Sequence, residues 1–255
     1  MAKIWITGDV HAQFTRLLPD RVPELKELGE DDYIIVCGDF GIWDNSRTEQ
    51  LIFDELSRQP YTILFVDGNH ENFDMLDAMP VDTWHGGKVH FIRNNVIHLM
   101  RGQVFEIDGK TFFTMGGAQS HDISDGILEP DDPHLKRKIM KFGLNGQYMY
   151  RINHVSWWKQ ELPSDEEYEE AIQNLKNHDW SVDCVLSHCC PSEVQDILSD
   201  GWYQHDRLTD WMDEIRSKLR FRHWFFGHYH DIRTIGVRYH LLYKNFFDLA
   251  EVIST

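Results

Sequence analysis

Five short polar clusters, each placed directly after a hydrophobic run, constrain the fold of this chain more than any other feature. They read GDVH, GD, GNHE, SH and GHYH, and they begin at Gly8, Gly38, Gly68, Ser187 and Gly227. The runs before them have the length and apolar composition of buried strands. Open α/β sheets place their site residues at the carboxyl ends of the strands, so we expect the clusters to gather at one edge. A glycine before the polar residue lets the backbone turn sharply there.

The polar side chains of these clusters are mainly carboxylates, imidazoles and one amide. Such donors suit Mn, Fe or Zn, whereas a site for a soft metal would need thiolates, and the chain has no C-x-x-C pair. A lone aspartate after a strand most often caps a helix or forms a turn. The joint pattern, and not any single residue, therefore indicates a site for two divalent metals.

The order and spacing of the clusters resemble the calcineurin-like metallophosphoesterase superfamily, whose blocks read D-x-H, G-D, G-N-H-E, H and G-H-x-H. The resemblance extends from Asp9 to His230, although the segment between the third and fourth blocks carries no motif. It implies an α/β fold, a two-sheet sandwich of mixed sheets flanked by helices. It also implies a hydrolase of phosphoric esters that uses a metal-bound hydroxide on two divalent or mixed-valence ions (Mn, Fe or Zn).

The resemblance also implies a role for each cluster residue. Asp39 would bridge the two ions, and His70 would be a non-ligand that stabilises the transition state or protonates the leaving oxygen. His121 is a candidate substrate contact. The other ligands implied for the first metal are Asp9, His11 and His230, and those for the second are Asn69, His188 and His228.

The second block departs from that of the protein phosphatases, which continues as G-D-x-V-D-R-G. Ile42 and Trp43 stand where that motif has an aspartate and an arginine. Asp44 either substitutes for the missing aspartate or caps the helix expected near Ser46. A dianionic monoester needs a guanidinium clamp more than a diester does. We therefore expect small phosphodiesters to be favoured, with a Ser/Thr-type protein phosphatase or another phosphomonoesterase as the alternative. An inactive metal-stabilised scaffold is the alternative from another class, and the presence of His70 argues against it.

The first third of the chain alternates strand and helix, which predicts a βαβαβ start. The strands are expected at 3–7, 33–37 and 61–66, and the helices at about 13–29 and 46–58.

Short strands follow from residue 89 and indicate a second, partly antiparallel sheet. Residues 103–107 and 111–115 flank Asp-Gly-Lys, which is a strong hairpin signal. A capping box at Ser164 opens a helix that extends to about Asn177. The remaining expectations are a helix over 206–218 and strands over 232–252.

We expect one domain, residues 1–255, with a possible lid at 116–158. This segment contains Gly116-Gly117, the run PDDP, the basic run KRK and Trp157-Trp158, with weak periodicity. Long irregular stretches in compact domains are usually functional lids or disordered. A surface excursion with a basic patch is the alternative.

Composition limits the classes of binding partner and indicates the cellular compartment. The formal charge of −17 argues against long nucleic acid, whose phosphates are neutralised by Lys and Arg. It leaves a small phosphate ester open, because bound dications override the local acidic field. Four cysteines without a disulfide pattern, no leader-like start and no long apolar run favour a cytoplasmic protein that does not enter membranes. Protein partners cannot be read from the sequence.

Overall fold

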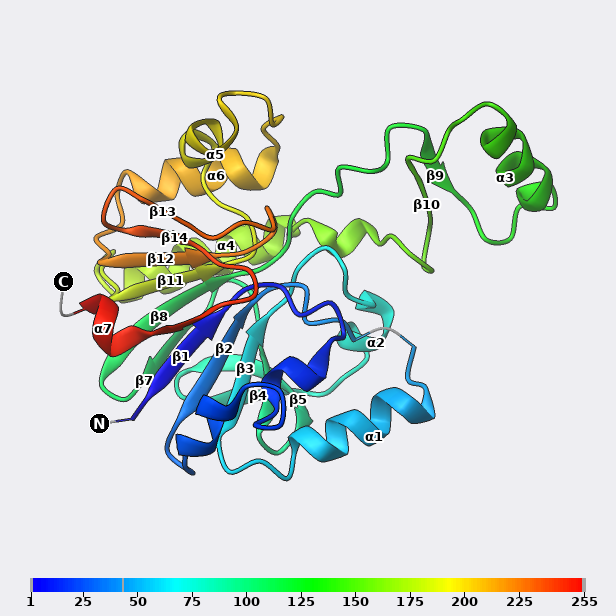
Figure 1. Cartoon of the computed structure of the whole chain (residues 1–255). Helices are drawn as coiled ribbons and strands as arrows, with labels where there is room; N and C mark the ends of the chain where they lie inside the picture. The colour runs from blue at the N-terminus through cyan, green and yellow to red at the C-terminus, as the bar shows by residue number, and fades with distance from the viewer. Residues whose placement is uncertain (1, 43, 254–255) are drawn as a thin grey trace.

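The computed structural model describes residues 2–42 and 44–253 (Figure 1). Trp43, which stands where the protein phosphatase motif has an arginine, lies outside the described residues. The strands are β1 Ile4–Thr7, β2 Tyr33–Cys37, β3 Thr62–Val66, β4 Val81–Trp84, β5 Gly87–Arg93, β6 Val96–Leu99, β7 Val104–Ile107, β8 Lys110–Met115, β9 Gly126–Leu128, β10 Tyr150–Ile152, β11 Cys184–Ser187, β12 His223–Phe226, β13 Arg233–Ile235, β14 Tyr239–Leu241 and β15 Phe246–Asp248. The α-helices are α1 Arg47–Leu56, α2 Phe73–Asp77, α3 Leu135–Leu144, α4 Asp165–Asn177, α5 Ser192–Ser199, α6 Arg207–Arg216 and α7 Leu249–Ile253, and the 3-10 helices are η1 Phe14–Leu17, η2 Pro23–Glu27 and η3 Lys159–Glu161.

Two mixed sheets form the body of the molecule. The larger sheet has the order β15-β1-β2-β3-β6-β5-β4, and the smaller has the order β13-β14-β12-β11-β8-β7. In both sheets the central strands are parallel and the edge strands are antiparallel. Parallel central strands end on the same side, which brings the five polar clusters to one edge.

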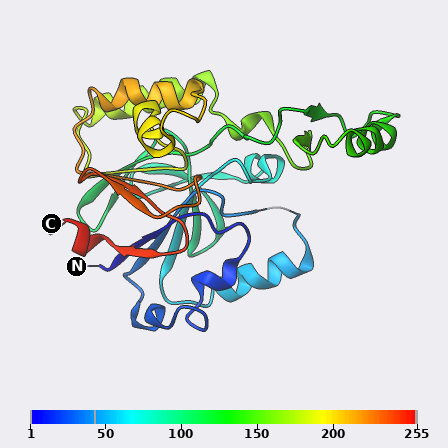
Figure 2. The same cartoon turned by 45° about the horizontal axis from the view of Figure 1, so that its top comes forward.

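Side chains alternate between the two faces of each strand, and this alternation separates the layer between the sheets from the outer layers. In β2, Ile35 and Cys37 point between the two sheets, where they meet residues of the smaller sheet such as Phe112. Ile34 and Val36 point outward and pack under α1. Helices α4, α5 and α6 cover the outer face of the smaller sheet (Figures 1 and 2). Two sheets between outer helices are the sandwich that the sequence predicted.

Several predicted elements are confirmed. The β7–β8 hairpin turns at Asp108 and Gly109, whose φ values of 47° and 70° suit a turn with two left-handed residues. The capping box is present, because the Ser164 side chain accepts from the Glu167 N–H and the Glu167 side chain accepts from the Ser164 N–H. Helix α6 begins after its cap, Asp206, as predicted.

Two predicted elements are wrong. The helix expected over 13–29 is replaced by the short 3-10 helices η1 and η2. Pro19 and Pro23 explain the break, since proline disfavours helical backbone in the preceding residue, and both Leu18 and Val22 are non-helical. Residues 249–252, the end of the region expected as strands, belong to the helix α7. The Asp248 carboxylate accepts a hydrogen bond from the Ala250 N–H at the start of this helix.

The segment expected as a lid forms an extended arm. Residues 123–149 carry β9 and α3 away from the sheets, and β10 begins at the next residue, Tyr150 (Figures 1 and 2). The two strands pair in parallel as a small separate sheet. Both ends of the arm return to the body. Across residues 2–42 and 44–253, no helix has the length and apolar composition needed to cross a membrane.

Candidate metal centre

The carboxyl ends of five parallel strands converge at one place. The loops after β1, β2 and β3 come from the larger sheet, and those after β11 and β12 come from the smaller one. They carry the residues that the sequence marked, which are Asp9, His11, Asp39, Asn69, His70, His188, His228 and His230.

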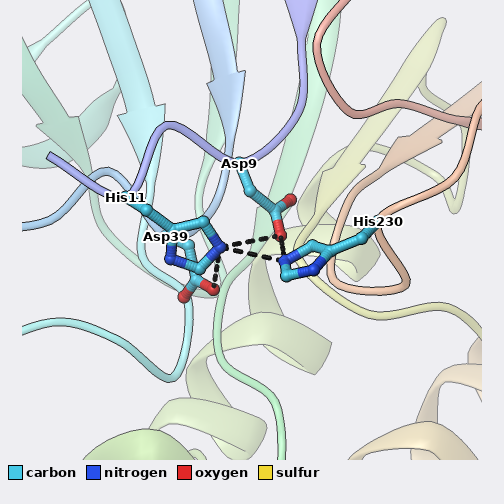
Figure 3. Close-up of side chains that lie close together, drawn as sticks. All are labelled: Asp9, His11, Asp39 and His230. Carbon is cyan, nitrogen blue, oxygen red and sulfur yellow. Dashed lines mark hydrogen bonds and ion pairs between the residues drawn. The ribbon is translucent and has the colours of Figure 1, made fainter. Parts of the chain in front are cut away.

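Four of these residues form one compact cluster. One ligand atom from each of Asp9, His11, Asp39 and His230 lies within 4.8 Å of the others, and the side chains point toward one another (Figure 3). His11 Nε2 lies 3.6 Å from a carboxylate oxygen of Asp9 and 3.6 Å from one of Asp39. His230 Nε2 lies 3.0 Å from Asp9 Oδ2 and 2.9 Å from His11 Nε2. These are the first-metal residues and the bridging carboxylate that the resemblance implied.

The remaining predicted ligands lie on the other side of Asp39. His188 Nε2 is 3.3 Å from Asp39 Oδ1 and 3.3 Å from Asn69 Oδ1. The His228 ring packs against that of His188, with centroids 5.0 Å apart. His121, the predicted substrate contact, also reaches this place, with its Nε2 2.8 Å from His228 Nε2.

The four-residue cluster fits a cation. Asp9 Oδ2 is buried and accepts no hydrogen bond from the residues that the structure describes, although His230 Nε2 lies 3.0 Å away. A buried carboxylate oxygen without a donor is costly unless a positive charge compensates it. Burial acts to raise the pKa of Asp9, but His11 and His230 lower it, so the carboxylate is ionised. An ionised carboxylate beside imidazole nitrogens is a donor set for Mn, Fe or Zn.

The backbone approaches these carboxylates too closely for any side chain. A Cβ on Gly227 would lie 2.1 Å from Asp9 Oδ1, and one on Gly68 would lie 2.1 Å from Asp39 Oδ1. The glycines of two clusters are therefore needed for close approach. Left-handed backbone at several of the site residues adds strain of the kind that persists at functional sites. The φ values are 47° at His11, 46° at Asp39, 69° at His228 and 51° at His230.

A family model for calcineurin-like phosphoesterases matches residues 2–231. The chain belongs to this family. A search of curated proteins gives no match. Family membership agrees with the two mixed sheets flanked by helices. Together with the Asp/His cluster it indicates hydrolysis of phosphoesters that depends on metal.

Sequence reasoning missed the residues that orient the predicted ligands of this phosphoesterase. Asn69 Nδ2 donates to Ser120 Oγ at 3.2 Å, which turns the amide oxygen toward His188. Ser120 Oγ donates in turn to the buried Glu161 carboxylate at 2.5 Å. His188 Nδ1 lies 2.9 Å from the Cys37 carbonyl oxygen, and a donated proton there leaves Nε2 as the ligand atom. Neither serine nor glutamate stands in a recognisable motif, so only the structure finds them.

Glu71, the last residue of GNHE, holds two clusters together. Its buried carboxylate accepts hydrogen bonds from the backbone N–H groups of Phe40, Gly41 and Ile42. Burial and the nearby charge of Asp39 raise the pKa of Glu71 to about 8. The loop after β2 is therefore tied to the loop after β3.

His70 lies beside the carboxylate proposed as the bridge. Its backbone N–H donates to Asp39 Oδ1 at 2.8 Å. Burial lowers the pKa of His70, and Asp39 opposes this shift, whereas the nearby Arg151 adds to it. His70 also lines a cavity of about 350 Å³ next to the cluster.

Asp44 lines the same cavity. Its carboxylate accepts from the Ser46 N–H at 2.9 Å, while Ser46 itself caps α1 by accepting from Glu49. Asp44 thus supports the turn before the helix, and the helix cap is the serine.

Proposed function

We propose that this protein hydrolyses phosphate esters on a pair of divalent metal ions, with small phosphodiesters favoured. The observation that carries the proposal is the position of Asp39 between two ligand groups. Its Oδ2 lies 3.6 Å from His11 Nε2, and its Oδ1 lies 3.3 Å from His188 Nε2. A carboxylate whose two oxygens face different groups is suited to bridge two cations.

The residues divide between the two ions around this bridge. Asp9, His11 and His230 would hold one ion, and Asn69, His188 and His228 the other. When bound, the ions supply Lewis-acid chemistry, polarising a phosphoryl oxygen and lowering the pKa of a water molecule. The protein keeps the donors in place through the hydrogen bonds and close backbone contacts described above. Mn, Fe and Zn all suit these donors, and several divalent or mixed-valence pairs satisfy the proposal.

His70 acts on the substrate and not on the metals. It lines the cavity beside Asp39, where a leaving group would lie. As a water oxygen bonds to phosphorus and the P–O bond to the leaving group breaks, a protonated imidazole there would donate its proton to the leaving oxygen.

The preference for diesters rests on the second block. Ile42 and Trp43 stand where the protein phosphatase motif has an aspartate and an arginine, so neither position supplies a charged side chain to a substrate. Ile42 is buried, and its backbone N–H donates to Glu71. A phosphomonoesterase, including a Ser/Thr-type protein phosphatase, remains the alternative. An inactive scaffold is the alternative of another class.

We also propose a cytoplasmic location and a single-domain organisation. All four cysteines are free and buried, which fits a reducing cytoplasm. We propose one domain over residues 1–255, in which the arm belongs to the active site. The partner is a small phosphate ester.

Two measurements test the proposal. Protein stripped with a chelator and reconstituted with Mn should regain two ions per chain by elemental analysis. It should then turn over bis-p-nitrophenyl phosphate at least as well as p-nitrophenyl phosphate, compared by kcat/KM. A strong preference for the monoester would move the phosphomonoesterase to first place. Metal-loaded protein that hydrolyses neither ester would favour the scaffold.

A further inference from the structure

The arm is fastened at its base by an ion pair between its two ends. Arg151 lies in β10, and Asp122 precedes β9. The Arg151 Nε donates to Asp122 Oδ1 at 2.9 Å, and Arg151 Nη2 donates to Asp122 Oδ2 in a second, shorter contact. This two-pronged contact fixes the plane of the guanidinium group.

A second anchor ties the returning end of the arm to α2. Trp158 Nε1 donates to Asp74 Oδ2 at 2.8 Å, and His154 Nδ1 lies 2.8 Å from the same oxygen. Trp158 is buried against the core of the larger sheet. The stretch that follows Arg151, residues 154–158, is therefore held against the body, although α3 lies far from it (Figure 1).

These anchors place arm residues in the cavity beside His70. Arg151, Val155 and Trp158 line this cavity of about 350 Å³ together with His70 and Asp44. Its size is at the small end of ligand pockets, which suits a compact organic group. Among the described residues that line it, Arg151 supplies the only permanent positive charge.

We infer that Arg151 contacts the phosphoryl group of the substrate and strengthens the binding of monoesters more than that of diesters. Asp122 positions this guanidinium and offsets part of its charge, so the contact supports monoester binding without reversing the proposed preference for diesters. The apolar wall of Val155 and Trp158 receives the organic part of the ester. This inference rests on the proposed function and extends it to substrate recognition.

The charge of the substrate explains why Arg151 would discriminate between monoesters and diesters. A monoester dianion carries one more negative charge and one more non-bridging oxygen than a diester. A guanidinium group binds such oxygens through paired, charge-assisted hydrogen bonds. Loss of the guanidinium should therefore cost the monoester far more than the diester.

The test compares Arg151→Gln with Arg137→Gln, an identical change at an exposed residue of α3 in the same arm. In Mn-reconstituted protein, Arg151→Gln should lower kcat/KM for p-nitrophenyl phosphate about 10–100-fold, the usual loss for a charged hydrogen bond. The value for bis-p-nitrophenyl phosphate should fall less than about threefold. Inorganic phosphate should bind at least about tenfold more weakly by calorimetry. Arg137→Gln should match the wild type throughout, and metal content should be equal in all three proteins.

Arg151→Lys distinguishes loss of the guanidinium group from a folding defect. It keeps the charge and loses the planar fork, so it should recover part of the monoester activity and phosphate affinity. If Arg151→Gln and Arg137→Gln behave alike with both esters and with phosphate, the inference is overturned while the proposed function stands. If the wild type hydrolyses neither ester, the proposed function fails, and the phosphate titration alone decides whether Arg151 binds phosphate.

Discussion

The backbone N–H of His228 donates a 2.9 Å hydrogen bond to Asp9 Oδ1, across 219 positions of sequence. Asp9 follows β1 of the larger sheet, and His228 follows β12 of the smaller one. The bond therefore joins the carboxyl ends of the two sheets at the metal centre. Because a main-chain group donates it, a change of the His228 side chain leaves it in place. Ligand substitutions at this site should consequently affect metal binding more than folding.

Asp39→Asn tests the bridge. The change keeps the size of the side chain and removes its charge, so the protein should lose at least one ion and most of its activity while staying folded. Elemental analysis and circular dichroism measure the two effects. Asp31→Asn, at an exposed position, is the control. Two ions at wild-type occupancy in Asp39→Asn would count against a bridge at this residue.

Ser120→Ala tests the orientation of Asn69. Without the hydroxyl, the Asn69 amide loses the acceptor that turns its oxygen toward His188. Loss of an orienting partner typically costs about 10–100-fold in metal affinity. Competition with a chelator should show this loss. Ser217→Ala, which removes a hydroxyl that donates to the Glu214 carbonyl at the end of α6, should show none. Equal affinities would reduce Ser120 to a packing role.

His70→Ala separates proton donation from metal binding. A general acid contributes about 10²–10⁴-fold, and mostly when the leaving oxygen is strongly basic. The variant should lose much of that factor on an alkyl ester and distinctly less on a nitrophenyl ester, with its metal content unchanged. An equal loss on both esters would mean that His70 stabilises charge on the phosphoryl oxygens. Loss of metal would make it a ligand.

Replacing residues 123–150 with a short Gly/Ser linker tests whether the arm takes part in catalysis. All proposed metal ligands lie outside this stretch, so both ions should remain bound. The KM and the preference among substrates should change, because Arg151 and Asp122 lose the β9–β10 pairing that supports them. Kinetics that stay the same over several esters would make the arm a surface excursion.

Arg101→Met tests a buried charge pair beneath the third cluster. Asp67 lies just before this cluster, and its Oδ2 accepts from Arg101 Nε at 2.8 Å, with both side chains buried. Removing one partner of a buried pair costs about 3–5 kcal/mol of unfolding free energy. Urea unfolding in chelator measures this cost, and Arg58→Met, which removes an exposed pair with Glu55, should change little.

The same pair predicts a dependence on pH. Burial alone would raise the pKa of Asp67, but Arg101 and His98 hold it well below its ordinary value of 3.8. A group with a depressed pKa contributes stability that is present above its unfolded pKa and is lost as the pH falls below it. The difference between wild type and Arg101→Met should therefore be largest near neutral pH and shrink on acidification, as Asp67 takes up a proton. A difference that does not depend on pH would assign the cost to packing alone.

Much of the site was predictable because its motifs are local. In GNHE and GHYH a glycine, the ligand and its neighbours stand side by side in sequence, and a buried strand precedes them. The helix expected over 13–29 is wrong because Pro19 and Pro23 restrict the backbone and interrupt the segment. Ser120, Glu161 and Arg151 had no signal, since each acts through a contact between distant parts of the chain.

The sequence by itself determined the strand ends, the glycines and the types of residue proposed as metal ligands, because periodicity and close approach are properties of short segments. Only the tertiary structure decided which oxygen of Asp39 faces which histidine, and that Arg151 returns to the cavity beside His70. The physical reason is that these relations depend on how two sheets and an arm pack together. That packing sums many weak contacts between residues far apart in the chain, and no single stretch of sequence encodes it.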